Sequence, residues 1–148
     1  MSLIFSGSVA SLLSRKWHAA LLARIYSEWT YNGARQPFMT LWKFLMTVLS
    51  NAHLAALVRT LNIGNWGFYP SAALKRGQDL QLPPEELKLV SNAIHNGGIQ
   101  HLEASIVRES LPRRDRRPLM ALLLTCLPNL STVYAHVPSC DPVLGTVI

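Results

Sequence analysis

The spacing of apolar side chains alternates between helical and strand periods along the chain. From Ser8 to Tyr26 they recur every three or four positions, which predicts an amphipathic helix with Ser8 as its N-cap. Residues 27–31 then alternate aromatic and polar side chains, which predicts a short strand ending at Asn32-Gly33. The apolar positions of the first helix are Leu12, Leu13, Trp17, Leu21, Leu22 and Ile25.

The next segment repeats the order of helix and strand. Residues 37–49 predict a second helix with Pro37 in its first turn, and residues 52–57 predict a short third one. The β-branched segment 58–63 predicts a second strand, which we expect Gly64-Asn65-Trp66-Gly67 to end. The apolar face of the second helix is Phe38, Leu41, Trp42, Leu45, Val48 and Leu49.

The second half of the chain contains the clearest helix signals. A helix is predicted from Glu85, after two prolines and with acidic residues in its first turn, to Asn96-Gly97-Gly98. Residues 99–109 suit both a helix and a repeat strand, and we favour a helix. Pro118 suits the first turn of a helix reaching Cys126 or Leu127, and 131–137 predicts a third strand.

The order of these elements predicts the fold class. Each strand follows at least one helix, so parallel pairing with the helices on the other side is expected. The crossovers should be right-handed. We therefore expect an α-rich α/β fold with about three short parallel strands and flanking helices.

Length, composition and charge narrow the classes of function. The 148 residues suit one domain, and 49% apolar against 15% charged residues excludes a disordered chain. A net charge of +6 favours acidic partners. No apolar run approaches the ~20 residues of a membrane span. Two cysteines, Cys126 and Cys140, form no disulfide framework, so we expect an intracellular protein of the cytoplasm or nucleus.

The start of the chain leaves a second localisation open. Its first 27 residues contain Arg15, Lys16 and Arg24, and the first acidic residue is Glu28. A basic, acid-poor, amphipathic start is also typical of a mitochondrial presequence. The alternative to an interaction protein is thus a small basic protein targeted to mitochondria or associated with nucleic acid.

Catalytic and metal-binding patterns are missing from the sequence. The five histidines form no i, i+4 pair of a zinc helix, and His136 with Cys140 lacks a second ligand pair. No G-x-S-x-G elbow or phosphate-binding loop is present. We expect no enzyme activity, no cofactor and no metal.

Two segments are candidate contact surfaces. The first is an aromatic set on a glycine-rich loop, formed by Trp66, Phe68 and Tyr69. The second is the basic cluster of Arg113, Arg114, Arg116 and Arg117 around Asp115, which suits an oxyanion or acidic peptide but also a solvated turn. No aromatic residue is interleaved in the cluster, so nucleic acid is not the favoured partner.

Three segments resemble a known family. Leu12-Leu13-Ser14-Arg15-Lys16-Trp17-His18, followed by Leu21 to Glu28, resembles the last helix of an F-box. The step His53 to Ile63 is similar to the helix-to-strand step of divergent leucine-rich-repeat domains in large fungal F-box-like families. The leucine run from Ala121, closed by Leu127-Pro128-Asn129-Leu130, is similar to their recurring end before a strand.

The resemblance implies a protein-interaction module. It divides the chain into an F-box-like helix and first strand (1–33) and an irregular leucine-rich-repeat-like solenoid fragment (34–148). It implies a substrate-recognition adaptor of a cullin-type ubiquitin ligase, whose substrate protein the sequence does not identify. An F-box normally opens with a leucine-proline motif and two more helices, whereas this chain opens with Met1-Ser2-Leu3-Ile4-Phe5. Much of the surface for a Skp-type adaptor is therefore expected to be missing.

The first helix is then the candidate docking element, through Leu12, Leu13, Trp17 and Leu21. If Trp17 packs against the first repeat, we expect Trp17→Ala to destabilise the fold by about 3–5 kcal/mol.

Overall fold

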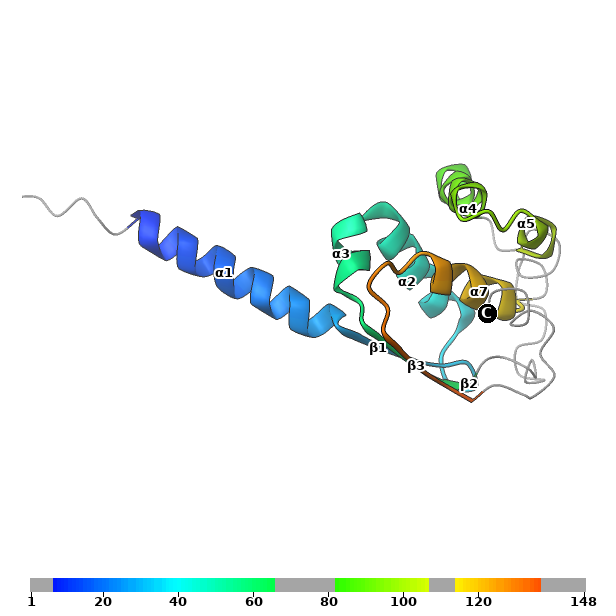
Figure 1. Ribbon diagram of the computed structural model, residues 1–148, viewed down its shortest axis with the longest axis horizontal. Helices are drawn as coiled ribbons and strands as arrows, with labels where there is room; N and C mark the ends of the chain where they lie inside the picture. The colour runs from blue at the N-terminus through cyan, green and yellow to red at the C-terminus, as the bar shows by residue number, and fades with distance from the viewer. Residues whose placement is uncertain (1–6, 66–81, 107–113, 137–148) are drawn as a thin grey trace, which may run out of the picture.

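Three short parallel strands organise the fold of the computed structural model, which describes residues 7–65, 82–106 and 114–136 (Figure 1). They are β1 (Glu28–Asn32), β2 (Thr60–Asn65) and β3 (Thr132–Ala135), in the order β1-β2-β3. Trp29 pairs with Leu61 and Leu61 with Val133, and both pairings are parallel. The predicted parallel sheet is confirmed.

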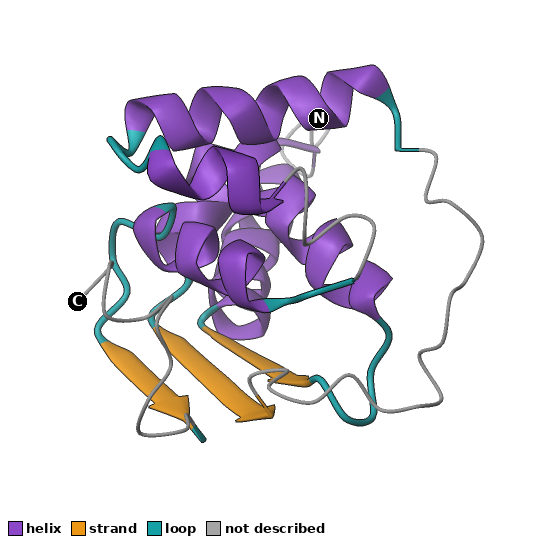
Figure 2. Ribbon diagram, turned by 90° about the vertical axis from the view of Figure 1, so that its right-hand side faces the viewer, coloured by secondary structure: helices purple, strands orange, loops and turns teal. Residues whose placement is uncertain are grey.

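Six helices accompany the sheet in the described residues. α1 (Gly7–Tyr26) precedes β1, while α2 (Phe38–Ser50) and α3 (Ala52–Leu57) connect β1 to β2. Along the chain, β2 is followed by α4 (Pro84–Asn96), α5 (His101–Ser105) and α7 (Arg117–Thr125), and then by β3. The helices that follow β1 cover one face of the sheet (Figure 2). The α-rich α/β class is therefore confirmed, and we call residues 28–65, 82–106 and 114–136 the body.

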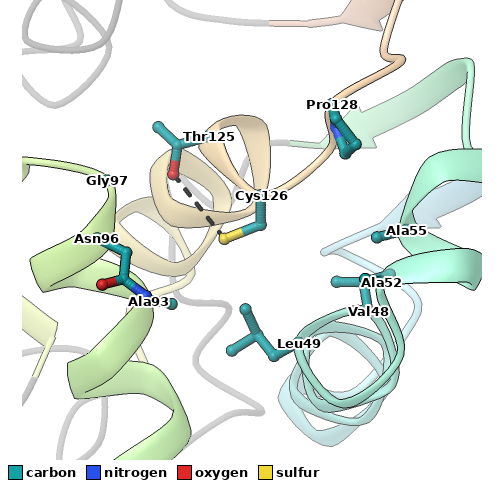
Figure 3. Close-up of a pocket in the computed structure, with 10 residues that line it drawn as sticks. All are labelled: Val48, Leu49, Ala52, Ala55, Ala93, Asn96, Gly97, Thr125, Cys126 and Pro128. Atoms are coloured by element: carbon teal, nitrogen blue, oxygen red, sulfur yellow. Dashed lines mark hydrogen bonds between the residues drawn. The ribbon is translucent and has the colours of Figure 1, made fainter.

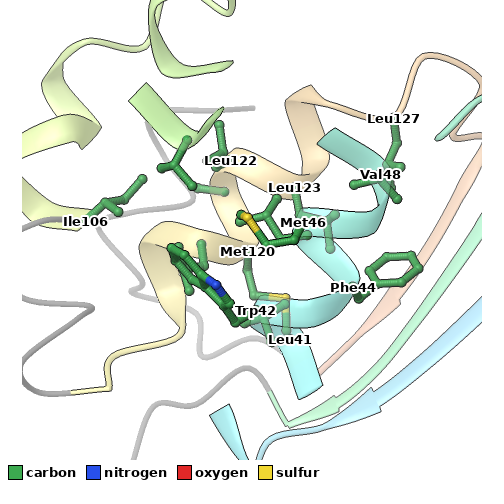
Figure 4. Packing of buried hydrophobic residues seen from close by; sticks show 14 of the residues in the cluster. Leu41, Trp42, Phe44, Met46, Val48, Ile106, Met120, Leu122, Leu123 and Leu127 are labelled. Carbon is green, nitrogen blue, oxygen red and sulfur yellow. The ribbon is translucent and has the colours of Figure 1, made fainter. Parts of the chain in front are cut away.

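The core lies between the sheet and the helices, with α2 and α7 at its centre (Figure 4). α2 contacts α3, α4 and α7, which explains why it buries residues on more than one face. Trp42 is 1% exposed, and its indole N–H donates to the Glu86 carboxylate of α4. α7 buries every residue from Pro118 to Leu123. The predicted apolar face of the second helix is buried at Phe38, Leu41, Trp42, Leu45 and Val48, while Leu49 is half-buried.

The boundaries of the second strand differ from the prediction. The strand begins at Thr60 rather than Val58, because Val58 caps α3 and its N–H donates to the Ala55 carbonyl. It also continues through Gly64, which we expected to end it. The register shifts beside Asn32 at this point, and a Cβ on Gly64 would lie 3.2 Å from the Asn32 side-chain nitrogen. Glycine therefore makes room for the bulge and does not break the strand.

Two later predicted elements extend beyond the described residues. The segment 99–109 was predicted as a helix, and its described part contains α5 at His101–Ser105, with Ile99, Leu102 and Ile106 buried. The third strand ends at Ala135, whereas the prediction extended it to Val137, which lies outside the described residues. The prolines at the starts of α4 and α7 lie in their first turns, as predicted.

α1 extends away from the body (Figure 1). Its C-terminal turn packs on the body, because Leu22, Ala23 and Tyr26 are half-buried and the helix contacts α3 and β1. The Ser27 hydroxyl donates to the Arg24 carbonyl at the end of the helix. Every side chain from Ser14 to Leu21 is exposed. The helix is thus held at one end.

Candidate protein-interaction surface

The exposed apolar side chains of α1 form a stripe along the helix. Trp17, Leu21 and Ile25 are 67%, 55% and 66% exposed. They are spaced four residues apart, so at about 100° per residue they lie within an arc of roughly 80° and along about 12 Å of helix. We call these three residues the α1 stripe. Such spacing is typical of the anchor residues that a helix places in a partner's groove.

Basic residues are distributed around α1 on more than one side of the helix. Arg15, Lys16, His18 and Arg24 are exposed on the same helix, and residues 7–26 contain no aspartate or glutamate. On the helical wheel, Arg24 and His18 each lie about 20° outside the stripe, on opposite sides. Arg15 and Lys16 lie on the far side of the helix, so Arg24 is the arginine or lysine that borders the stripe among the described side chains.

The large stability effect of Trp17→Ala was expected only if Trp17 packs against the first repeat, and its 67% exposure shows that this condition is not met. Trp17 and Leu21 lie on α1, and more than half of each side chain is exposed. Leu12 and Leu13 lie in the same helix, but their side chains are outside the described part. The exposed position of Trp17 and Leu21 leaves these predicted docking residues available to another molecule, so that docking stays a prediction.

The outer face of the sheet is a second exposed surface. Strand alternation directs Trp29, Tyr31, Leu61 and Ile63 toward the helices, where they are half-buried or buried. The outward positions therefore carry polar side chains in two rows across the strands. The rows are Glu28, Thr60 and Thr132, and Thr30, Asn62 and Tyr134. Tyr134 is 63% exposed and is the largest side chain of this face.

The basic cluster is only partly at the surface. Arg116, which we predicted as a partner-binding residue, is 1% exposed, and this prediction is wrong. Its Nε donates to the Tyr31 hydroxyl at 2.6 Å and one terminal nitrogen donates to the Gln36 carbonyl. The residue ties the start of α7 to the end of β1. Sequence reasoning missed this role because the acceptors lie 80 and 85 positions away.

The other cluster residues are paired, half-buried or outside the described ranges. Arg117 forms an ion pair with Asp115, whose carboxylate also accepts the Arg117 backbone N–H. Arg114 is half-buried in the left-handed backbone region, with φ of 55°. Arg113 and the aromatic set Trp66, Phe68 and Tyr69 lie outside the described residues, so their predicted role stays a prediction.

A groove on the helical side has a volume of about 370 Å³. It lies between α2, α3, α4 and α7, and the Cys126 thiol faces it (Figure 3). The lining is mainly small and apolar, with Asn96 and Thr125 as polar members. Burial raises the pKa of Cys126. The hydrogen bond with the Thr125 hydroxyl lowers this pKa, but by a smaller amount. The neutral thiol is therefore favoured, and the groove has no activated nucleophile at this cysteine.

Tyr31 is the second group with a shifted pKa. Burial raises the pKa of its phenol, and the Arg116 guanidinium opposes this shift through its charge and its hydrogen bond. The Tyr31 hydroxyl donates a hydrogen bond to the backbone carbonyls of Gln36 and Pro37. The phenol therefore stays protonated and serves as a link between neighbouring elements.

Comparisons with known proteins do not assign the chain to a family. No protein-family model matches it, and neither the curated proteins nor the solved structures give a significant match. Within residues 7–65, 82–106 and 114–136, no three His, Cys, Asp or Glu side chains are grouped to hold a metal ion. No helix of the same residues is long and apolar enough to cross a membrane. The α1 stripe and the outer face of the sheet are the two candidate contact surfaces of the described residues.

Proposed function

We propose that the chain is a protein-protein interaction module whose main contact surface is the α1 stripe. The observation that carries this proposal is a tryptophan, a leucine and an isoleucine that stay exposed on a projecting helix while the body buries its own core. Aromatic and aliphatic anchors of this kind supply much of the binding energy in protein interfaces. A helix held at one end can present them to a partner.

A repeat-like body is the second part of the proposal. The step from α3 to β2 lies beside the step from α7 to β3, because Asn129 donates to the Ala56 carbonyl and Ser131 donates to the Arg59 carbonyl. These are the two segments that resemble leucine-rich-repeat domains. The second crossover is more than twice as long as the first, so the repeats would be irregular. The outer face of the sheet would then recognise a substrate protein.

If the chain acts in a cullin-type ubiquitin ligase, the partner of α1 would be a Skp-type adaptor. Its support is the F-box-like sequence around Trp17 and the exposure of Trp17 and Leu21. Direct binding of the full chain to a purified Skp-type adaptor tests it. Binding that disappears in Trp17→Ala would support the adaptor role, whereas no binding would leave a module with another partner.

Affinity capture tests the general proposal. We would compare the proteins bound by the wild-type chain with those bound by Trp17→Ala/Leu21→Ala/Ile25→Ala. Lys43→Ala is the matched control, since Lys43 is exposed on α2 and distant in the sequence from the stripe. We expect a defined set of proteins to be lost with the triple variant and kept with the control. Identical sets for all three chains would contradict the proposal.

Subcellular fractionation of the same tagged chain tests the mitochondrial alternative. The acid-free helix at residues 7–26 is the observation that favours it. If the tagged chain fractionates entirely with mitochondria and residues 1–27 are removed there, α1 is a targeting segment and the interaction proposal fails. An intact chain outside mitochondria supports the interaction module.

A further inference from the structure

The two edges of the sheet differ in how their backbone groups are satisfied. β1 and β3 are the edge strands, since the strand order is β1-β2-β3. At the end of β1, the Asn32 N–H donates to the Gln36 side chain, and the Asn32 carbonyl accepts from the N–H groups of Arg35 and Gln36. The register with β2 also shifts beside Asn32. Bulges and neighbouring segments limit the pairing of an edge strand with another chain, so the β1 edge is partly closed.

The edge at β3 is open in the described part of the chain. The N–H groups of Thr132 and His136 donate to the carbonyls of Arg59 and Ile63, on the side of β2. Backbone groups of successive residues in a parallel ladder point to opposite sides of the strand. The N–H and carbonyl groups of the two residues at 133 and 135 therefore point away from β2, and no described strand lies beyond them.

The side chains of β3 are exposed on both faces of the strand. Val133 pairs with Leu61 and faces the helices, but it is 42% exposed, whereas Leu61 is 0% exposed. Tyr134, on the outer face, is 63% exposed. Residues 127–136 contain no aspartate, glutamate, lysine or arginine, although charges of this kind commonly protect an edge strand. Alternating N–H and carbonyl groups along this edge are matched by another extended backbone.

We propose that two copies of the chain pair through the open edge of β3 and join their sheets into one. A two-fold axis makes the two strands antiparallel. In the register that joins the whole of residues 132–136, Tyr134 lies opposite Tyr134 of the second copy, and Val133 lies opposite Ala135. The outward backbone groups of Val133 and Ala135 then bond to each other across the axis. This contact is separate from the α1 stripe and adds a second mode of association.

The match of side chains across the axis favours a second copy over an unrelated extended peptide. The two Tyr134 rings meet on the outer face, and aromatic pairs opposite each other stabilise paired strands. On the helical face, the larger Val133 meets the smaller Ala135. No like-charged pair is opposed, because β3 carries no charged side chain. The assembly closes at two copies, because the partly closed β1 edge disfavours the head-to-tail contact that would build a filament.

The test is sedimentation of the full chain at concentrations up to about 1 mM, since a four-residue strand forms a small interface and a weak dimer. Two variants add the same charge to exposed positions of the outer face: Tyr134→Lys at the proposed axis and Thr30→Lys on β1. Like charges directly opposite each other oppose strand pairing. Ala135→Pro removes an N–H that points to the open edge and leaves the bonds to β2 in place.

We expect a monomer–dimer equilibrium. Tyr134→Lys and Ala135→Pro should each raise its dissociation constant by about tenfold or more, and Thr30→Lys by less than about threefold. Hydrogen exchange followed by NMR gives a readout on the unmodified chain. The amides of Val133 and Ala135 should gain protection as the concentration rises, whereas the Thr132 amide, which is bonded to the Arg59 carbonyl, should be protected at every concentration.

Four results would overturn the inference. They are a monomer at every concentration, equal weakening of the dimer by Tyr134→Lys and Thr30→Lys, protection of the Val133 and Ala135 amides that does not depend on concentration, and a dimer that Leu21→Glu dissociates while Tyr134→Lys leaves it intact. The third result assigns the edge to a contact within one chain, and the fourth assigns self-association to α1. Affinity capture with the variants of the α1 stripe decides the proposed interaction function separately.

Discussion

Trp17 and Trp42 lie on two helices of the same chain, but their surroundings are opposite. Trp42 is 1% exposed in the centre of the body, where it packs with Phe38 and donates to Glu86. Trp17 is 67% exposed on α1. Both belong to apolar patterns with helical spacing, so the pattern alone does not distinguish a core position from a contact position. The difference teaches that the body uses its tryptophan in a packed core, whereas α1 exposes one, as the proposed contact role requires.

The largest predicted effect is in the body. Trp42→Ala should lower the free energy of unfolding by about 3–5 kcal/mol, because it leaves a cavity in a packed core and removes the partner of Glu86. Chemical denaturation followed by circular dichroism measures the change. A loss below about 1 kcal/mol would show that the body is not the stable part of the molecule.

A smaller effect is expected at the buried link between β1 and α7. Tyr31→Phe removes the hydroxyl that accepts the Arg116 Nε hydrogen bond, so it should cost about 1–3 kcal/mol by leaving a buried guanidinium short of an acceptor. Adding Arg116→Met removes the charge and should recover part of this loss. A double-mutant cycle measures the coupling. Strictly additive losses would rule out the link.

The body should also lose stability at alkaline pH. Burial raises the pKa of Cys126 and of Tyr31, so the folded state keeps these protons when the unfolded state releases them. The free energy of unfolding should therefore fall as pH rises above about 9, and be unaffected by these groups below it. Cys126→Ala should make the fall shallower. Denaturation curves between pH 7 and 10.5 test this, and identical slopes would refute it.

The smallest effect on stability is predicted for α1. Trp17→Ala should change the free energy of unfolding by less than about 0.5 kcal/mol, since the side chain is largely in solvent. The same denaturation assay as for Trp42 gives a direct comparison. A loss of several kcal/mol would mean that Trp17 is buried in solution and that the comparison between the two helices is wrong.

The elements of the fold could be predicted largely from local signals. Helical spacing around Trp42, prolines before α4 and α7, and alternation at Trp29 and Tyr31 each depend on neighbouring residues, and all three led to elements that the structure contains. The bulge beside Gly64 could not be predicted, because it depends on Asn32 of another strand. Periodicity describes one segment at a time.

The candidate surface was predicted from the sequence less completely than the elements of the fold. Trp17 and Leu21 were correctly placed on one helix, but their exposure depends on where the body packs against that helix, which no local pattern encodes. Arg116 shows the reverse error. Four arginines around one aspartate suggested a surface cluster, yet tertiary contact with Tyr31 buries one of them. Long-range contacts decided both cases.

Site-specific photo-crosslinking in cells tests the central claim most directly. A photoreactive amino acid would replace Leu21 in the α1 stripe in one chain and the exposed Lys43 of α2 in another. We predict a discrete crosslinked partner protein from position 21 and none from position 43. No crosslink at position 21, or the same crosslinked proteins from both positions, would contradict the account of α1 as the contact surface of the molecule.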